Sequence, residues 1–439
     1  MANLAPLSSI DEPSVAALIA ARPQLSMHAF DGLVLEGVPL AQIADKLGTP
    51  VWVYGAGTMR ARLAALQTAL AGLNAEVHYA VKANDHLAVL KVMAAGGAGA
   101  DVVSGGELQR ARKAGIAADH IVFSGVGKTR DELALALREG IFQINVESAE
   151  ELGMISEIAT ALGRIARVAL RINPDVDAGT HAKITTGKAE NKFGIQYDQA
   201  AALYARASTL PGVEPVGIAL HIGSQILTTA PYRAAFARAA ELIRTLRAMG
   251  QTVTRMDCGG GIGIGYGDEP GASPEALAGA IRVAFGSMDL QLMVEPGRWL
   301  VGPAGLLLAS VVLTKGEDRF VVIDAAMNDL VRPAMYDAWH GIVPLSSGNA
   351  VGATSLVDVV GPICESSDTF ATARALPSLP AGSRVAILDA GAYGAVMSST
   401  YNARPQPAIA MVDGDRWTVI RRRQTYEDLW AGESIPEFL

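Results

Sequence analysis

Eight short apolar runs alternate with longer helical segments between residues 76 and 295, and this alternation limits the fold more than any other feature. The segments between the runs, such as 129–139 and 231–249, are rich in Ala and Leu at helical spacing. Strands that alternate with helices run parallel, and eight such units in about 250 residues fit a (β/α)8 barrel. The runs expected to form strands are 76–82, 100–103, 120–124, 141–146, 167–172, 216–221, 253–257 and 290–295.

A doubly wound open sheet has the same local pattern and is the rival fold. The Gly-rich stretch "CGGGIGIGYG" at 258–267 favours that rival, because dinucleotide-binding folds carry a glycine fingerprint. That fingerprint belongs after the first strand, however, whereas this stretch follows the seventh. The barrel is therefore the predicted architecture.

After residue 297 the pattern changes, because no long helices separate the strand-like runs. These runs are 306–313, 319–324, 356–360, 384–389, 407–412 and 416–421. Gly, Pro, Asp and Ser separate these runs, which is typical of an antiparallel β domain. The stretch 30–47 has a strand-like start followed by a helix, and we expect it to add a strand to that domain. The predicted boundaries are 1–29 for an N-terminal extension, 30–48 for the strand and helix that join the β domain, 49–300 for the barrel and 301–439 for the C-terminal β domain.

Composition excludes several classes of protein. Hydrophobic residues make up 50% of the chain, charged residues 18%, and the net charge is -8. The only basic run is 421–423, so nucleic acid is not an expected partner. The uncharged stretch between Arg298 and Lys315 is short and contains Pro303, so no membrane span is expected. Two cysteines in a chain without a secretory n-region favour a reducing compartment, and we expect a soluble cytoplasmic enzyme.

Reactive or polar residues stand where several predicted strands end. In a barrel of this kind, the carboxyl ends of the strands form the active-site rim. Each such residue alone is more often structural: a strand-end charge marks the exit into water, and three glycines are more often a turn. Together they supply an amine, an imidazole, an amide-rich loop and a carboxylate. These residues are Lys82 after the first strand, His221 and Ser224 after the sixth, Gly259, Gly260 and Gly261 after the seventh, and Glu295 and Arg298 after the eighth.

This set matches the chemical needs of pyridoxal 5'-phosphate. A lysine amine forms a Schiff base with the cofactor's aldehyde. Glycine amides approach a phosphate closely because no side chain intervenes. A carboxylate that pairs with the pyridine nitrogen keeps it protonated, so that the ring accepts electrons. A histidine at the rim can stack on the ring face.

The sequence resembles the diaminopimelate decarboxylase family, within the group IV decarboxylases of fold type III. The resemblance covers the chain from about residue 30 to its end, in the expected order. The motifs that carry it are "YAVKAN" (79–84), "ADVVSGGEL" (100–108), "KFGI" (192–195), "HIGSQI" (221–226), "GGGIGIGY" (259–266), "EPGR" (295–298), "NDLVRPAMYDAWH" (328–340), "GPICESSD" (361–368) and "DAGAYGAVMSSTYNARP" (389–405).

The resemblance implies a homodimer that decarboxylates meso-2,6-diaminopimelate to L-lysine, the last step of lysine biosynthesis by the diaminopimelate route. It implies that Lys82 is the Schiff-base lysine, that Cys364 reprotonates the intermediate left after carbon dioxide departs, and that Cys364 and Glu365 act in the partner's site. The segment 181–194 resembles the family's loop over the active site, and no metal site is expected. The implied cofactor contacts are Lys82, His221, Ser224, Gly260, Gly261, Glu295, Pro296, Gly297, Arg298 and Tyr393. The implied substrate contacts are Arg298, Arg332, Tyr336, Glu365 and Tyr393.

Three other functions remain as alternatives at this point. A decarboxylase of ornithine or lysine would share the fold, but the related ornithine enzymes carry Cys-Asp in place of Cys364-Glu365. An alanine racemase shares the barrel and cofactor, but needs an acid–base pair on opposite faces of the substrate and would lack "GPICESSD". A catalytically inactive relative would tend to lose the lysine, the cysteine or the phosphate contacts, and all of these are present here.

Overall fold

The computed structural model describes residues 12–176, 193–350 and 352–439, which form two compact units. Of the described residues, 60–176, 193–264 and 271–300 form one unit, and 12–59, 265–270, 301–350 and 352–439 form the other. The segment 181–194, expected to cover the active site, lies outside the described residues except for its last two. Among the described residues, no helix is both long enough and apolar enough to cross a membrane.

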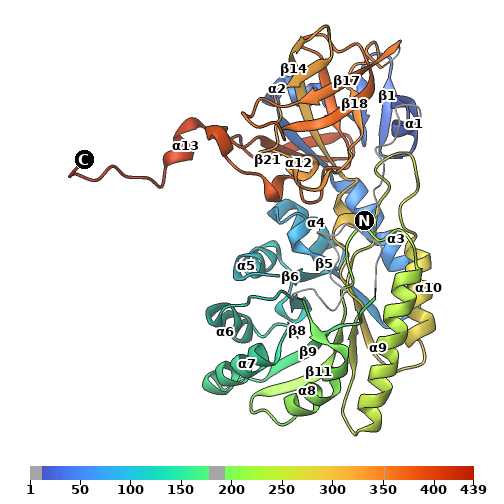
Figure 1. The fold of residues 1–439 in the computed structure, drawn as a ribbon, viewed down its shortest axis with the longest axis vertical. Helices are drawn as coiled ribbons and strands as arrows, with labels where there is room; N and C mark the ends of the chain where they lie inside the picture. Colours follow the sequence, from blue (N-terminus) through green and yellow to red (C-terminus); the bar gives the residue numbers. More distant parts are fainter. Residues whose placement is uncertain (1–11, 177–192, 351) are drawn as a thin grey trace. The chain divides into compact units, whose positions relative to one another are not determined.

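The first unit is the predicted parallel barrel (Figure 1). Its strands are β5 (Ala75–Ala80), β6 (Gly99–Val102), β7 (Ile121–Phe123), β8 (Gln143–Val146), β9 (Ala166–Asn173), β11 (Val213–Ala219), β12 (Arg255–Asp257) and β13 (Gln291–Val294). Each strand pairs in parallel with the next, and β13 pairs with β5, which closes the ring. An open doubly wound sheet has no such closing pair, so the rival fold is excluded. The short strand β10 (Ile195–Gln196) adds a further parallel pair to β9.

The barrel helices follow the strands and pack side by side around them. They are α4 (Leu87–Ala95), α5 (Gly105–Ala114), α6 (Arg130–Glu139), α7 (Ala149–Leu162), α8 (Ala200–Ala207), α9 (Ala230–Ala248) and α10 (Pro274–Phe285). In Figure 1, α5, α6 and α7 lie along the outer side of the strands. Sequence signals fix where they begin: Thr129 and Glu132 form a capping box on α6, and the Ser148 side chain caps α7.

The second unit is a β domain built on a mixed sheet with the strand order β18-β17-β15-β14-β4-β20-β21, which β16 and β19 extend. The strands are β4 (Val51–Gly55), β14 (Gly305–Lys315), β15 (Phe320–Ile323), β16 (Ile342–Pro344), β17 (Thr354–Val360), β18 (Thr369–Pro377), β19 (Arg384–Ile387), β20 (Ala408–Asp413) and β21 (Arg416–Arg421). Most pairs are antiparallel as predicted, but β20–β4 and β15–β17 are parallel.

An N-terminal strand joins this sheet, as predicted, but it is a different segment. Strand β4 lies between β14 and β20, and all five of its residues are buried. The stretch 30–48 instead forms β2 (Gly32–Leu35), β3 (Val38–Pro39) and α2 (Leu40–Leu47). With β1 (Leu25–His28), these strands make a separate three-stranded sheet. Strand β4 has five residues, whereas β2 has four and β3 has two, so β4 is the longer segment for pairing along both of its edges.

Residues 12–29, assigned to an extension from the sequence, are part of the β unit. Helix α1 (Val15–Ala20) places Leu18 in the same buried core as Leu33, Val53 and Leu308. The Nε atom of Arg22 donates to Asp389 at 3.0 Å. This N-terminal segment is therefore held to the β unit by both apolar packing and a buried ion pair.

The remaining helices are α3 (Ala56–Ala69), α11 (Arg298–Val301), α12 (Arg332–Tyr336) and α13 (Tyr426–Trp430).

Candidate active site

Lys82 lies in a short 3-10 turn, Val81–Ala83, directly after the first barrel strand. Its Nζ atom is 2.9 Å from Oδ2 of Asp101, which is fully buried on the neighbouring strand. Ala80 pairs with Asp101 in the register of β5 and β6, so the lysine two residues later is within reach of that carboxylate. The barrel therefore holds a primary amine at the carboxyl end of its first strand by a charge-assisted hydrogen bond.

Glu295 follows β13, the strand next to β5, and its carboxyl group is buried. Ser124 lies 3.5 Å from its Oε1 atom, and Asp257 forms a side-chain hydrogen bond with it. The side-chain amide of Asn145 connects Ser124 with Asp257, because it donates to Ser124 at 3.0 Å and to Asp257 at 2.8 Å. A polar network thus crosses the barrel interior beneath the predicted ring-nitrogen carboxylate.

Burial raises the pKa of Glu295 well above its ordinary value, and the nearby charges of Asp101 and Asp257 raise it further. Burial also raises the pKa of Asp257, although Glu295 and Asn145 stabilise its ionised form by hydrogen bonds. Two carboxyl groups that share a hydrogen bond need one proton between them. Burial and mutual repulsion therefore favour one shared proton on this pair of carboxyl groups, and Glu295 is the member of the pair that stands at the strand end.

Sequence reasoning missed Asp101, Ser124, Asn145 and Asp257. A signal was available, because strands of a closed parallel barrel are buried on both sides and read as continuous apolar runs. A polar residue inside such a run, such as Asp101 in "GADV" or Asn145 in "QINV", therefore indicates a partner inside the barrel.

His221 lies just beyond β11 and receives a long hydrogen bond of 3.4 Å from the backbone N–H of Gly260 at Nδ1. Since Nδ1 accepts, the ring proton lies on Nε2. Burial lowers the pKa of His221 well below its ordinary value, and the positive charges of Arg171 and Lys82 lower it further. The barrel rim therefore presents a neutral, flat imidazole, which suits stacking on an aromatic ring.

The three glycines after β12 run so close to other backbone that no side chain fits. A Cβ atom would lie 2.1 Å from the carbonyl oxygen of Leu220 at Gly259, and 2.1 Å from that of Glu295 at Gly260. Gly259 also has a φ of +70°, which favours glycine. The loop is thus packed against the ends of both β11 and β13, and only glycine allows this approach.

Arg298 and Ser224 lie beside this loop. The Nη2 atom of Arg298 is 3.3 Å from the Ser224 hydroxyl, and the Arg298 side chain is buried. The backbone N–H of Ile226 donates to the carbonyl of Gly261 at 2.9 Å, which ties the serine loop to the glycine loop. A buried cation, a hydroxyl and side-chain-free backbone form an anion-binding set suited to a phosphate.

These residues fit pyridoxal phosphate on the chemistry of their donors and acceptors. The phosphate would lie with Ser224, Arg298 and the glycine loop, and the ring nitrogen with Glu295. The "EPGR" backbone is fixed in the same place, because the N–H of Ala80 donates to the carbonyl of Pro296 at 3.1 Å and the N–H of Leu300 donates to Gly297 at 3.1 Å.

The predicted substrate residues of the β unit begin with Arg332 and Tyr336 on α12. They lie four residues apart, so they share one face of this helix. Arg332 is buried, and its Nη1 atom is 2.7 Å from Nε2 of His340. Tyr393 lies in the loop after β19 with a φ of +56°, a conformation that is strained for a tyrosine and clusters at functional sites.

Cys364 and Glu365 lie in an exposed loop of the same unit that a later motif holds in place. Asn402 accepts a hydrogen bond from the Cys364 backbone N–H at 3.2 Å, and the Tyr401 hydroxyl donates to Glu365 at 2.5 Å. Asp368 accepts from the backbone N–H groups of Ile363 and Met327, each at 2.7 Å. Asp368 thus links this loop to the segment that leads to Arg332. Asp368, Tyr401 and Asn402 stand inside the conspicuous motifs but were not singled out from the sequence.

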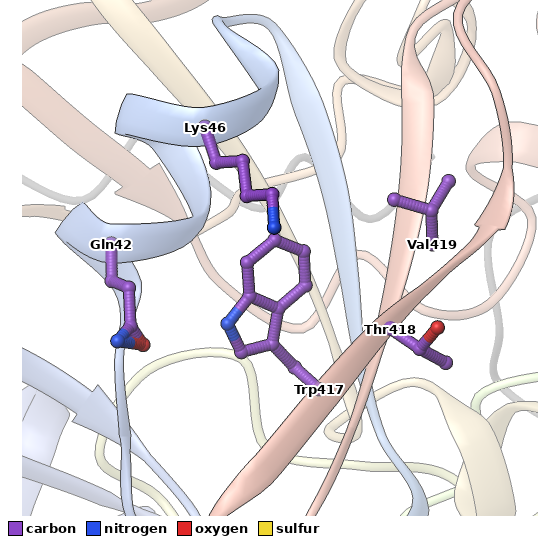
Figure 2. Close-up of a pocket in the computed structure, with 5 residues that line it drawn as sticks. All are labelled: Gln42, Lys46, Trp417, Thr418 and Val419. Atoms are coloured by element: carbon purple, nitrogen blue, oxygen red, sulfur yellow. The ribbon is translucent and has the colours of Figure 1, made fainter.

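A separate surface hollow of about 500 Å³ lies on the β unit, lined by Gln42, Lys46, Trp417, Thr418 and Val419 (Figure 2). Lys46 stands over the indole of Trp417, with Nζ 5.6 Å from the ring centroid. None of the predicted site residues lines it, so it is not the candidate active site.

The barrel matches a known family of cofactor-binding domains. Residues 56–302 match the family described as "Pyridoxal-dependent decarboxylase, pyridoxal binding domain". This match agrees with the closed barrel and with the amine, carboxyl and glycine set at its rim. Fold and site together define a pyridoxal-phosphate-dependent decarboxylase of fold type III.

Similarity to individual proteins shows which family of these decarboxylases the chain belongs to. The chain is 46% identical to the diaminopimelate decarboxylase of Zymomonas mobilis over 414 residues, which cover 93% of this chain and 98% of that protein. The crystal structure of diaminopimelate decarboxylase from Helicobacter pylori complexed with L-lysine is 40% identical, with a TM-score of 0.86 over 89% of this chain and 98% of that one. The M. jannaschii enzyme in co-complex with L-lysine is 35% identical, with a TM-score of 0.90 over 95% and 99%. The chain belongs to the diaminopimelate decarboxylase family.

Proposed function

We propose that this chain releases carbon dioxide from meso-2,6-diaminopimelate and leaves L-lysine, as the last step of lysine biosynthesis by the diaminopimelate route. The observation that carries the proposal is that two adjacent barrel strands end in an amine and a buried carboxyl group. Lys82 follows β5, and the buried acid Glu295 follows β13. Bound pyridoxal phosphate supplies an acceptor for the electron pair left behind when carbon dioxide departs.

In this proposal the barrel residues hold the cofactor. Lys82 would bind it covalently, and Asp101 keeps the amine in place at 2.9 Å. Glu295 would pair with the ring nitrogen and keep it protonated, and the neutral imidazole of His221 would stack on the ring. Ser224, Gly260, Gly261 and Arg298 would hold the phosphate, and Pro296, Gly297 and Tyr393 would complete its surroundings.

The far end of the substrate carries an ammonium and a carboxylate that do not react. Arg298 and Arg332 offer planar donor pairs that match a carboxylate, and Tyr336 and Tyr393 add hydroxyl groups. Glu365 pairs with the ammonium. A substrate without the distal carboxylate leaves buried donors unpaired, at a cost of about 1–3 kcal/mol each.

The protonation step needs an acid near the reacting carbon, and we assign it to Cys364. A thiol is a weak acid that can donate a proton to carbon at neutral pH. Cys364 is exposed in the single chain, as expected of a residue that completes its site in a second subunit. We therefore propose a cytoplasmic homodimer in which each subunit lends Cys364 and Glu365 to its partner. The boundaries 49–300 and 301–439 also remain predictions.

The proposal is tested by comparing kcat/KM across diamino acids with the cofactor-loaded protein. We expect meso-diaminopimelate to exceed L-lysine, L-ornithine and D-ornithine by at least about a hundredfold, because three or more distal hydrogen bonds are lost with each of them. A higher kcat/KM for any of the other three would assign the chain to a different basic amino acid.

A further inference from the structure

Arg332, the residue proposed to bind the distal carboxylate, is held on two sides by side chains with no assigned role. Its Nη1 atom is 2.7 Å from Nε2 of His340, and its guanidinium carbon is 4.9 Å from the centroid of the Tyr266 ring. The His340 and Tyr266 rings meet edge to face, with centroids 5.2 Å apart and planes at 79°. The three side chains thus contact one another pairwise inside the β unit.

The hydrogen bonds of His340 determine its protonation state. Its Nδ1 atom is 2.7 Å from the carbonyl oxygen of Leu388, which can only accept, so Nδ1 carries a proton. The Arg332 guanidinium can only donate, so Nε2 carries none. The imidazole is therefore neutral, and it fixes the guanidinium without neutralising its positive charge. A carboxylate in the same place would cancel the charge that an anionic ligand needs.

His340 is itself fixed to the sheet. It precedes β16, which pairs with β19, and the backbone N–H of Leu388 donates to Gly341 at 2.8 Å. Its carbonyl accepts from Nη1 of Arg374 at 2.8 Å, and Arg374 forms an ion pair with Glu12 at 3.0 Å. His340 is buried, with 1% of the residue's surface exposed. His340 therefore connects Arg332 to the sheet through a neutral ring.

We propose that His340 and Tyr266 are positioning residues that hold Arg332 in the orientation required for a distal carboxylate. They would thereby set the preference for substrates that carry an anion at that end. This inference rests on the proposed function, because it takes Arg332 as the group that reads the carboxylate. Neither residue needs to touch the substrate.

Two ligands separate this role from a general structural one. L-lysine retains the carboxylate of the unreactive end, and cadaverine is the same diamine without that carboxylate. We expect the cofactor-loaded protein to bind L-lysine more tightly than cadaverine, and the ratio of their Kd values reports on the contacts to the distal carboxylate, Arg332 among them. Calorimetric titration gives both Kd values without turnover.

Two substitutions of His340 form a matched pair. His340→Asn keeps a donor near the Nδ1 position but removes the acceptor that faces Arg332. His340→Gln places an amide oxygen near the Nε2 position and keeps that acceptor. We expect His340→Asn to raise the Kd of L-lysine by about tenfold or more and to change the Kd of cadaverine by less than about threefold. We expect His340→Gln to recover most of the L-lysine affinity.

The Tyr266 pair gives a second test that does not depend on the folding of the His340 variants. Tyr266→Leu removes the aromatic face over which Arg332 lies, and Tyr266→Phe keeps it. We expect the ratio of the cadaverine Kd to the L-lysine Kd to fall in Tyr266→Leu and to stay unchanged in Tyr266→Phe. An equal weakening of both ligands, or an unchanged ratio, in His340→Asn or Tyr266→Leu would overturn the proposal.

Arg332→Ala distinguishes this inference from the proposed function. If Arg332→Ala abolishes the preference for L-lysine and His340→Asn does not, the positioning role fails while the function stands. If the unaltered protein binds L-lysine no better than cadaverine, the role of Arg332 itself fails.

Discussion

The amine of Lys82 lies 2.9 Å from a carboxylate oxygen of Asp101, which is fully buried on the adjacent barrel strand. The pairing of Ala80 with Asp101 brings the two residues together, so the contact follows from the register of β5 and β6. A fixed amine at a strand's carboxyl end is what covalent binding of an aldehyde cofactor requires.

Replacing Lys82 removes the proposed covalent link to the cofactor. We expect Lys82→Ala to lose the near-visible absorption band of the cofactor-loaded protein and to lose turnover. Lys91→Ala is the matched control, because Lys91 is exposed on α4 of the same barrel and should keep both. An undiminished band in Lys82→Ala would assign the covalent link to another amine.

Glu295→Gln keeps the size of the side chain but removes the acid at the ring nitrogen. We expect the absorption band to persist, because Lys82 is intact, while kcat falls by about a hundredfold or more, as when other preorganised charge-stabilising groups are removed. Absorption spectra and single-turnover rates measure the two effects separately. A variant with nearly full kcat would contradict the role of Glu295.

Sequence patterns predicted the barrel well and the β domain less well. The eight barrel strands were recognisable because each is a short apolar run bounded by helices, and Thr129 and Ser148 marked helix starts by their capping side chains. Strands β16 and β18 were missed. Strand β16 has only three residues, and β18 (Thr369–Pro377) alternates irregularly between buried and exposed positions. Mixed pairing, as in β20–β4, depends on contacts between distant segments and leaves no local signal.

The site was predictable where a residue ends a strand, as Lys82 and Glu295 do. It was less predictable where a side chain acts on another side chain. Asp101, Asp257 and His340 are recognised only when the partner atom is in place, because their roles depend on distances between segments that are far apart in sequence.

Glu107 gives a prediction about stability and pH. Burial raises its pKa to about 7, and Asp101 adds to the rise, although the Val103 backbone N–H donates to it at 2.7 Å. Between about pH 4.5 and 7 the folded protein therefore holds a proton that the unfolded chain has released, so stability falls as the pH rises. We expect wild type to lose about 1–3 kcal/mol more than Glu107→Gln between pH 5 and pH 8. Urea unfolding at both pH values measures this, and equal losses would rule out the raised pKa.

Subunit mixing tests the proposed dimer. Lys82→Ala and Cys364→Ala should each be nearly inactive alone, because each lacks one half of every site. After subunit exchange, half of the dimers are mixed and each contains one intact site, so we expect about a quarter of wild-type activity for a two-fold dimer. Light scattering and tagged subunits verify that exchange occurred. No recovery after verified exchange would mean that each chain builds its own site.

The most direct test of the account is the stoichiometry of products from meso-diaminopimelate labelled in its carboxyl groups. The account predicts equal amounts of carbon dioxide and L-lysine, formed only with pyridoxal phosphate present and Lys82 intact. Chiral analysis should find lysine of the L configuration, because the centre held by Arg332 and Glu365 does not react. Carbon dioxide without L-lysine, or no carbon dioxide from the fully loaded protein, would contradict it.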